Sequence, residues 1–147
     1  YADDFLFTLQ TRDFLPILAH PERNPAVKAD PDCLQPWLER GIFVQLNTAS
    51  LLGRMGSRTQ TTARALLATG RVHFVGSDAH SAGARSPDLQ EAVQVLTELL
   101  GPDETAVLLA HNPSALPADR PEAIRAPCAR PQPVKMSWRG RLASLWR

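Results

Sequence analysis

The stretch that decides the fold is Val72–His80, with the sequence VHFVGSDAH. Its first four residues are a short apolar run, and Asp78 and His80 follow soon after. Side chains two positions apart in an extended segment point the same way. The pattern predicts a strand that delivers a carboxylate and an imidazole to one place, a pairing that suits zinc, manganese or iron. A capped turn, in which Asp78 accepts backbone N–H groups, is the alternative interpretation of these residues alone.

A second cluster of the same kind lies upstream, where the apolar run 14–19 ends at His20 and is followed by Glu22 and Arg23. The length of the run favours a short buried strand, with His20 at the edge of the sheet. Arg23 can present a planar guanidinium to phosphate oxygens. Alone, His20 would be a structural histidine, and Glu22 would be solvated or paired with an arginine. Two such clusters at equivalent places favour a shared metal centre.

Between these clusters the chain alternates helical and extended patterns. Helices are predicted over 2–12, 31–40, 57–69, 87–100 and 102–110, and strands over 14–19, 42–46 and 72–75. Ser57 or Thr59 is the expected N-cap of the third helix. The alternation predicts an α/β fold with parallel strands joined by helical crossovers. In such folds the chemistry collects at the carboxyl ends of strands, which is where the polar clusters 20–23, 45–50 and 77–80 lie.

Three further residues are candidates for a functional role. Arg85 lies in a glycine-containing loop and is either a second anion clamp or an exposed loop arginine, because spacing alone does not decide. His73 lies within a predicted strand and is interpreted as structural. His111 follows the last predicted helix and is interpreted as a turn or cap residue.

The composition is that of one globular domain: 147 residues, 44% hydrophobic, with a formal net charge of +1. This charge does not favour nucleic-acid binding, and the apolar runs are too short to span a bilayer. Cys33 and Cys128 are widely spaced without a CxxC pattern, so a reducing cytoplasm is the expected compartment. The chain starts at Tyr1 rather than Met, and we expect it to be a segment of a longer protein.

Composition changes near residue 117. We expect residues 1–116 to form the domain and 117–147, which carry five prolines and seven Lys or Arg, to form a tail that is disordered or loosely attached over 117–136. The basic and apolar end, 137–147, is either a frayed tail or an amphipathic helix at a membrane surface or on a partner.

Four motifs give the chain a specific resemblance. They are PILAHPERN at 16–24, VQLNTASLLG at 44–53, GSDAH at 76–80 with Arg85, and the pair Asn112-Pro113. In this order and spacing they resemble the PHP-domain tyrosine-protein phosphatases, bacterial enzymes that accompany capsular or extracellular polysaccharide synthesis alongside tyrosine autokinases. The resemblance covers about residues 1–116. The first and third motifs together are much more specific to this family than an Asp-x-His pair alone.

The resemblance implies the C-terminal portion of a distorted PHP-type β/α barrel, with about three parallel strands and up to three divalent ions, often manganese. The positions that match metal ligands are His20, Asp78 and His80, and those that match phosphate-binding residues are Arg23 and Arg85. A water activated by the metal would attack the phosphorus of a phosphotyrosine substrate, such as a tyrosine autokinase. The arginines would stabilise charge on the non-bridging oxygens.

The chain also departs from the family pattern, which adds a His-x-His pair, another His and a bridging Glu before the HPER segment. The histidines here are at positions 20, 73, 80 and 111. Three strands cannot close a barrel, so we expect exposed sheet edges, weak binding of one ion and little phosphatase activity from this chain alone. The alternatives are a PHP phosphoesterase that acts on a small phosphate ester, and a truncated, non-catalytic binding module.

Overall fold

The computed structural model describes residues 1–80 and 89–127. Its sheet has three parallel strands in the order β1-β2-β3, with bounds β1 Ile17–Ala19, β2 Phe43–Asn47 and β3 Phe74–Gly76. The register pairs Ile17 with Phe43 and Asn47 with Gly76. The predicted α/β fold with parallel strands is confirmed, whereas closure into a barrel stays a prediction.

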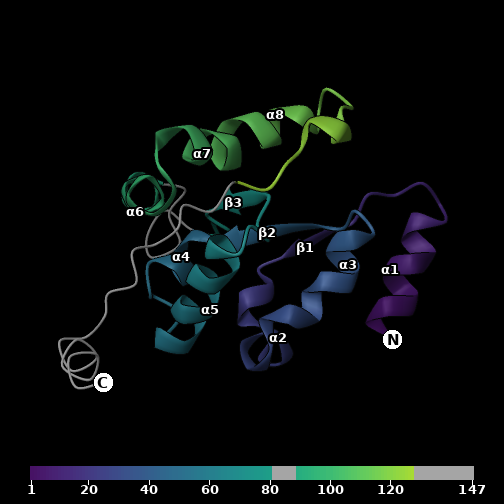
Figure 1. Ribbon diagram of the computed structural model, residues 1–147, viewed down its shortest axis with the longest axis horizontal. Helices are drawn as coiled ribbons and strands as arrows, with labels where there is room; N and C mark the ends of the chain where they lie inside the picture. Colours follow the sequence, from purple (N-terminus) through teal and green to yellow (C-terminus); the bar gives the residue numbers. More distant parts are fainter. Residues whose placement is uncertain (81–88, 128–147) are drawn as a thin grey trace, which may run out of the picture.

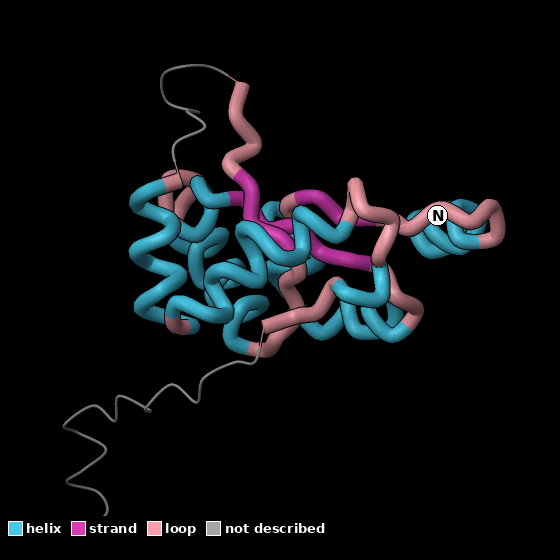
Figure 2. The backbone as a smooth tube through the Cα atoms, turned by 90° about the horizontal axis from the view of Figure 1, so that it is seen from above, coloured by secondary structure: helices cyan, strands magenta, loops and turns pink. Residues whose placement is uncertain are grey.

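Helices fill both connections between the strands. The elements before and between the strands are α1 (Ala2–Gln10), η1 (Pro21–Arg23), α2 (Pro25–Ala29), η2 (Pro31–Leu34), α3 (Gln35–Glu39), α4 (Thr48–Leu51) and α5 (Ser57–Ala68). After β3 come α6 (Gln90–Leu100), α7 (Pro102–Ala106), η3 (Val107–His111), α8 (Asn112–Ala115) and η4 (Pro121–Ala123). In Figure 1, α2 to α5 lie below the sheet, α7 and α8 lie above it, and α6 lies at the left of the view. Figure 2 shows the three strands side by side between these helices.

Glycines with positive φ mark the ends of two predicted helices. Gly41 (φ 79°) follows α3 and Gly70 (φ 66°) follows α5, in a conformation that a side chain disfavours. The expected N-cap of α5 was wrong, because Gly56 occupies that position and no side chain caps the helix. Prolines at the first or second position begin α2, η2 and α3 and divide the predicted helix 31–40 into two pieces.

The main hydrophobic core lies between the sheet and the longer helices. Its fully buried members include Val44 and Leu46 of β2, Leu66 of α5 and Leu96 of α6. A smaller cluster forms around Phe74 of β3, with Ala115, Ile124 and the half-buried Phe43. Since side chains alternate along β2, this strand contributes Val44 and Leu46 to one cluster and Phe43 to the other.

β1 is one of the two edge strands of the described sheet, and the expectation that it is buried was wrong. Ile17 and Ala19 are exposed and Leu18 is half-buried, because no described strand pairs with the outer side of β1. A cavity of about 750 Å³ lies between this edge and α1, and its lining is mostly apolar apart from polar residues that include His20 and Arg23. Asp3 of α1 bridges to α3, since it accepts a hydrogen bond from Trp37 Nε1 at 2.8 Å.

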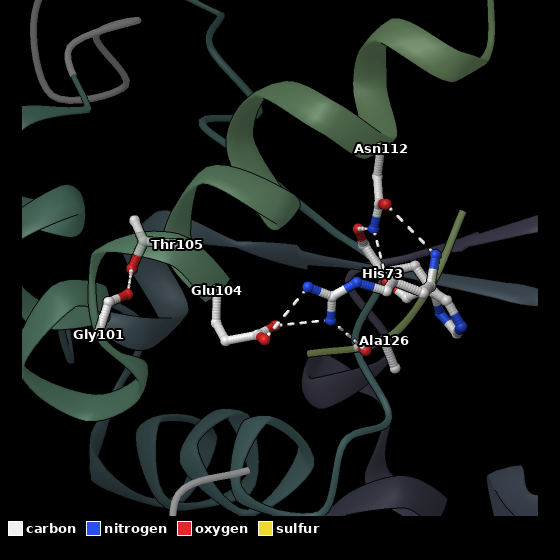
Figure 3. A network of polar contacts seen from close by, with 7 residues as sticks. His73, Gly101, Glu104, Thr105, Asn112 and Ala126 are labelled. Carbon is white, nitrogen blue, oxygen red and sulfur yellow. Dashed lines mark hydrogen bonds and ion pairs between the residues drawn. The ribbon is translucent and has the colours of Figure 1, made fainter. Parts of the chain in front are cut away.

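Asn112 joins the C-terminal segment to the sheet, as Figure 3 shows. Its Nδ2 donates to the carbonyl oxygens of His73 (2.6 Å) and Arg125 (2.7 Å). Arg125 also forms an ion pair with Glu104 of α7 at 2.7 Å, and Ile124 is 9% exposed. The residues around Ile124 and Arg125 therefore contact the body, and the boundary expected near residue 117 stays a prediction.

Two expectations for the C-terminal region stay predictions. The basic stretch 137–147 and Cys128 lie outside the described residues, and so does the greater part of the predicted tail. Among the helices of residues 1–80 and 89–127, none combines the length and the apolar character needed to cross a bilayer.

Candidate metal and phosphate site

The candidate site lies at the carboxyl edge of the sheet, where three strands end. His20 follows β1, Asn47 ends β2, and Asp78 comes two residues after β3. The backbone N–H of His20 donates to the carbonyl oxygen of Gln45 at 2.8 Å, which extends the β1–β2 pairing as far as His20. Because the strands are parallel, these polar residues are brought to one edge, as the sequence predicted.

His20 and Asp78 share a backbone conformation that is uncommon outside glycine. His20 has φ 41° and ψ 50°, and Asp78 has φ 51°. Left-handed backbone in such residues costs on the order of 1 kcal/mol, and it persists where surrounding contacts hold it in place. In both places the chain turns sharply just beyond a strand, which directs the following polar residues along the sheet edge.

Asp78 is the centre of the polar contacts in this region. Its Oδ2 accepts a hydrogen bond from Asn47 Nδ2 at 3.1 Å and lies 3.8 Å from Arg23 Nη1. Its Oδ1 lies 3.8 Å from His80 Nδ1. The side chain of Asp78 is 22% exposed and that of Arg23 is 34% exposed, so both groups are open to a ligand from solution.

The contact of His80 with the backbone determines which ring nitrogen carries the proton. Its Nδ1 lies 2.6 Å from the carbonyl oxygen of Asp78, and a carbonyl oxygen can only accept. Nδ1 therefore donates, and Nε2 carries the lone pair that a metal ion would bind. A backbone carbonyl that fixes the ring in this way is the usual support of a metal-bound histidine.

Glu22 is the residue in this region whose position differs from the sequence interpretation. It is fully buried, and its Oε1 accepts the backbone N–H of Asn47 at 3.1 Å. The other carboxylate oxygen, Oε2, is buried and has no hydrogen-bond partner among residues 1–80 and 89–127. The interpretation of Glu22 as solvated or paired with an arginine was wrong, because its partner is a backbone amide of the neighbouring strand.

The predicted metal ligands are brought together only in part. Asp78 and His80 lie close together, with 3.8 Å between Oδ1 and Nδ1, and the half-buried His20 lines the cavity beside β1 with Arg23. In residues 1–80 and 89–127, no three His, Cys, Asp or Glu side chains are grouped closely enough to hold a metal ion. The pair of a carboxylate and an imidazole with Nε2 as acceptor fits a divalent ion. The convergence of His20 stays a prediction.

The remaining candidates are His73, His111 and Arg85. His73 is structural, as expected: its Nδ1 accepts the Val44 N–H at 3.1 Å, and burial lowers its pKa to about 4. His111 is exposed at the end of η3, directly before α8. Arg85 lies outside the described residues, so its role stays a prediction.

Together, fold and site define an α/β protein with a carboxylate, imidazole and guanidinium cluster at the carboxyl edge of a parallel sheet. Residues 1–117 match the family described as capsular polysaccharide synthesis, CpsB/CapC. The chain belongs to the CpsB/CapC family, which confirms the resemblance seen in its motifs.

Individual relatives agree with this assignment. The tyrosine-protein phosphatase YwqE of Bacillus subtilis (strain 168) is 34% identical over 135 residues, which cover 92% of this chain and 51% of that protein. The putative tyrosine-protein phosphatase CapC of Staphylococcus aureus is 36% identical over 81 residues, covering 55% of this chain and 32% of the relative. The chain therefore spans about half of the Bacillus protein and a third of the Staphylococcus protein.

A solved structure shows the same relationship. It comes from work that describes YwqE of Bacillus subtilis and CpsB of Streptococcus pneumoniae as unique metal-dependent tyrosine phosphatases. Its TM-score to this chain is 0.65 at 31% identity, over 92% of this chain and 53% of the solved chain. The fold described above is therefore shared with about half of that protein.

Proposed function

We propose that this chain is the C-terminal part of a metal-dependent protein-tyrosine phosphatase that acts on a bacterial tyrosine kinase of polysaccharide synthesis, in the cytoplasm. The observation that carries the proposal is the placement of Asp78 between Arg23 and His80. This joins a metal-binding pair to a phosphate-binding cation at one sheet edge. The names of the relatives as tyrosine-protein phosphatases support the same activity.

The metal ligands in this proposal are His20, Asp78 and His80, with Mn²⁺ as the candidate ion. Divalent ions, when bound, supply activation of the attacking water and neutralise the charge of the phosphate. The ligand atom of His80 is Nε2, since Nδ1 donates to the carbonyl oxygen of Asp78. The carboxylate of Asp78 accepts a hydrogen bond from Asn47 Nδ2 through Oδ2.

Arg23 binds the phosphate in this proposal. Its guanidinium lies beside the Asp78 carboxylate and lines the cavity next to β1, so it can donate to two non-bridging oxygens at once. Stronger donation as negative charge develops on these oxygens lowers the barrier. Arg85 has the same role in the proposal. A phenolate leaves readily, so no strong general acid is required from the chain.

The proposal assigns only weak activity to residues 1–147 by themselves. The chain spans about half of the Bacillus subtilis relative, β1 leaves one side of the described sheet unpaired, and no three-ligand group is formed in the described residues. Further ligands would come from barrel strands of the complete domain.

The test measures Mn²⁺-dependent phosphate release from a phosphotyrosine peptide and from small phosphate esters. It compares residues 1–147 with the same chain extended by the in-frame coding sequence that precedes it. We expect the extended protein to favour the peptide, to lose activity without Mn²⁺ and to be inactivated by Asp78→Asn. A preference for small esters would contradict the proposed substrate, and strong hydrolysis by residues 1–147 alone would contradict the weak activity assigned to them.

A further inference from the structure

Asn47 occupies a position between two elements of the site. It is the last residue of β2, is 2% exposed, and is also the N-cap residue of α4. Its Oδ1 accepts the backbone N–H of Ala49 at 2.8 Å. Because the carbonyl oxygen of the amide is held by this cap, the NH₂ group is directed the other way. There it donates to Asp78 Oδ2 at 3.1 Å.

The backbone of Asn47 is fixed from a third direction. Its N–H donates to Oε1 of Glu22 at 3.1 Å, and Glu22 is fully buried on η1, two residues after His20. A continuous chain of hydrogen bonds therefore runs from Glu22 through Asn47 to Asp78 and links the ends of all three strands. Such a network restricts the position of each member more than one contact could.

The geometry points to Asn47 as a positioning residue that holds the Asp78 carboxylate in the orientation needed to bind a metal ion. This inference rests on the proposed function, which makes Asp78 a ligand. Asn47 and Arg23 both approach Oδ2, whereas His80 lies on the side of Oδ1, so the plane of the carboxylate is defined. The contact also helps to hold the left-handed backbone of Asp78. Outer contacts of this kind tune metal affinity.

The substitution Asn47→Asp separates the two contacts of this side chain. Aspartate caps a helix as well as asparagine does, so the bond to Ala49 is retained. The donor to Asp78 is lost, and two carboxylates then face each other. Binding is measured by titrating the chain with Mn²⁺ and following the ion by electron paramagnetic resonance. We expect Asn47→Asp to bind Mn²⁺ roughly 10- to 100-fold more weakly than the wild-type chain. Asn47→Ser retains a capping oxygen but is too short to reach Asp78, and it is used if Asn47→Asp does not fold.

A matched control exists at the N-cap of α2. Asn24 caps that helix through Oδ1 and Ala26 N at 2.9 Å, in the same way as Asn47, but it is exposed. Asn24→Asp makes the same chemical change one residue from Arg23. We expect it to alter Mn²⁺ affinity less than threefold, a much smaller effect than that of Asn47→Asp. Equal losses in the two variants would overturn the inference, because the effect would then be one of added charge.

Exchanging the side chains of Asn47 and Asp78 tests their contact in the absence of a metal ion. Asn47→Asp should lower the Tm by about 3 to 6 °C, since a buried carboxylate at position 47 would repel the half-buried carboxylate of Asp78. The double variant Asn47→Asp/Asp78→Asn restores one donor facing one acceptor, and we expect it to recover more than half of this loss. It should not recover Mn²⁺ affinity, because the carboxylate is then on the wrong residue. Additive effects of the two substitutions on Tm would overturn the inference.

The two readouts distinguish failure of this inference from failure of the proposed function. If Asp78→Asn leaves Mn²⁺ affinity unchanged, or if neither the chain nor its extended form binds Mn²⁺, the proposed metal site is wrong and the exchange still decides whether Asn47 holds Asp78. If Asp78→Asn abolishes binding while Asn47→Asp and Asn47→Ser do not weaken it, the metal site stands and the positioning role of Asn47 is wrong.

Discussion

His73 accepts a hydrogen bond from the backbone N–H of Val44, with 3.1 Å between Nδ1 and the amide nitrogen. The imidazole also packs edge-on against Phe43, with ring centroids 5.1 Å apart. Burial of the ring lowers its pKa from 6.5 to about 4. The neutral imidazole therefore supplies an acceptor to the β2 backbone, and protonation of Nδ1 would remove it.

The free energy of unfolding should consequently decrease as the pH is lowered through a defined window. Between pH 6.5 and 4 the unfolded chain binds a proton at position 73 that the folded chain does not, so the free energy of unfolding decreases as the pH falls. The expected contribution is roughly 2 kcal/mol over the window, after a discount for the partial exposure of the ring. Urea unfolding at several pH values measures it. His73→Gln should flatten the dependence and His111→Gln, on the surface, should not. An unchanged slope in His73→Gln would contradict this account.

Asn112 should be important for the attachment of the C-terminal segment. Asn112→Ala leaves the carbonyl oxygens of His73 and Arg125 without their donor, and the side chain is 1% exposed. A loss of about 2 to 3 kcal/mol in the free energy of unfolding is expected. Limited trypsin digestion should also cut faster after Arg125. The exposed neighbour on α8, Ser114→Ala, is the control. Wild-type protection of the Arg125 bond in Asn112→Ala would show that the segment is held by other contacts.

The core between β2, α5 and α6 should respond strongly to truncation. Leu66 is 0% exposed and belongs to the main cluster, so Leu66→Ala should cost about 2 to 5 kcal/mol through lost burial and a residual cavity. Leu116, which is 42% exposed, provides the matched control, and Leu116→Ala should change stability by no more than about 0.5 kcal/mol. Chemical denaturation of both variants measures the difference. Similar losses in the two would contradict the assigned core.

Arg23→Lys should separate phosphate binding from metal binding. Lysine retains the charge but not the planar fork that holds two oxygens. We expect roughly tenfold weaker inhibition by inorganic phosphate in the extended protein, with Mn²⁺ affinity changed less than threefold. Arg58→Lys on the exposed face of α5 serves as the control. If Arg23→Lys weakens Mn²⁺ and phosphate binding equally, Arg23 acts through Asp78 rather than on the phosphate.

Much of the sheet was predictable from the sequence, because β2 and β3 are short apolar runs followed by polar residues. The exposure of β1 was not, since a strand at the edge of a sheet has the same local pattern as a central one. The helices α2 and α4 were missed because each is about one turn long. Their N-cap residues are Asn24 and Asn47, whose capping role depends on the backbone around them.

The candidate site was also predictable only in part. The strand ends brought Asp78 and His80 to one edge, which residue spacing could indicate. The burial of Glu22 and the bond from Asn47 to Asp78 join segments more than 20 positions apart, as the separations of 25 and 31 residues show. No local pattern contains that information. A signal was present in Asn47 itself, a polar residue at the end of an apolar strand, although its partner could not be named.

The central claim is that His20, Asp78 and His80 bind one divalent ion, and the most direct measurement is the Mn²⁺ content and affinity of the chain and of its extended form. Asp78→Ala and His20→Ala should each lower affinity at least about tenfold, while His111→Ala, on the surface, leaves it within about twofold. Unchanged affinity in Asp78→Ala and His20→Ala, with both variants folded, would contradict the account.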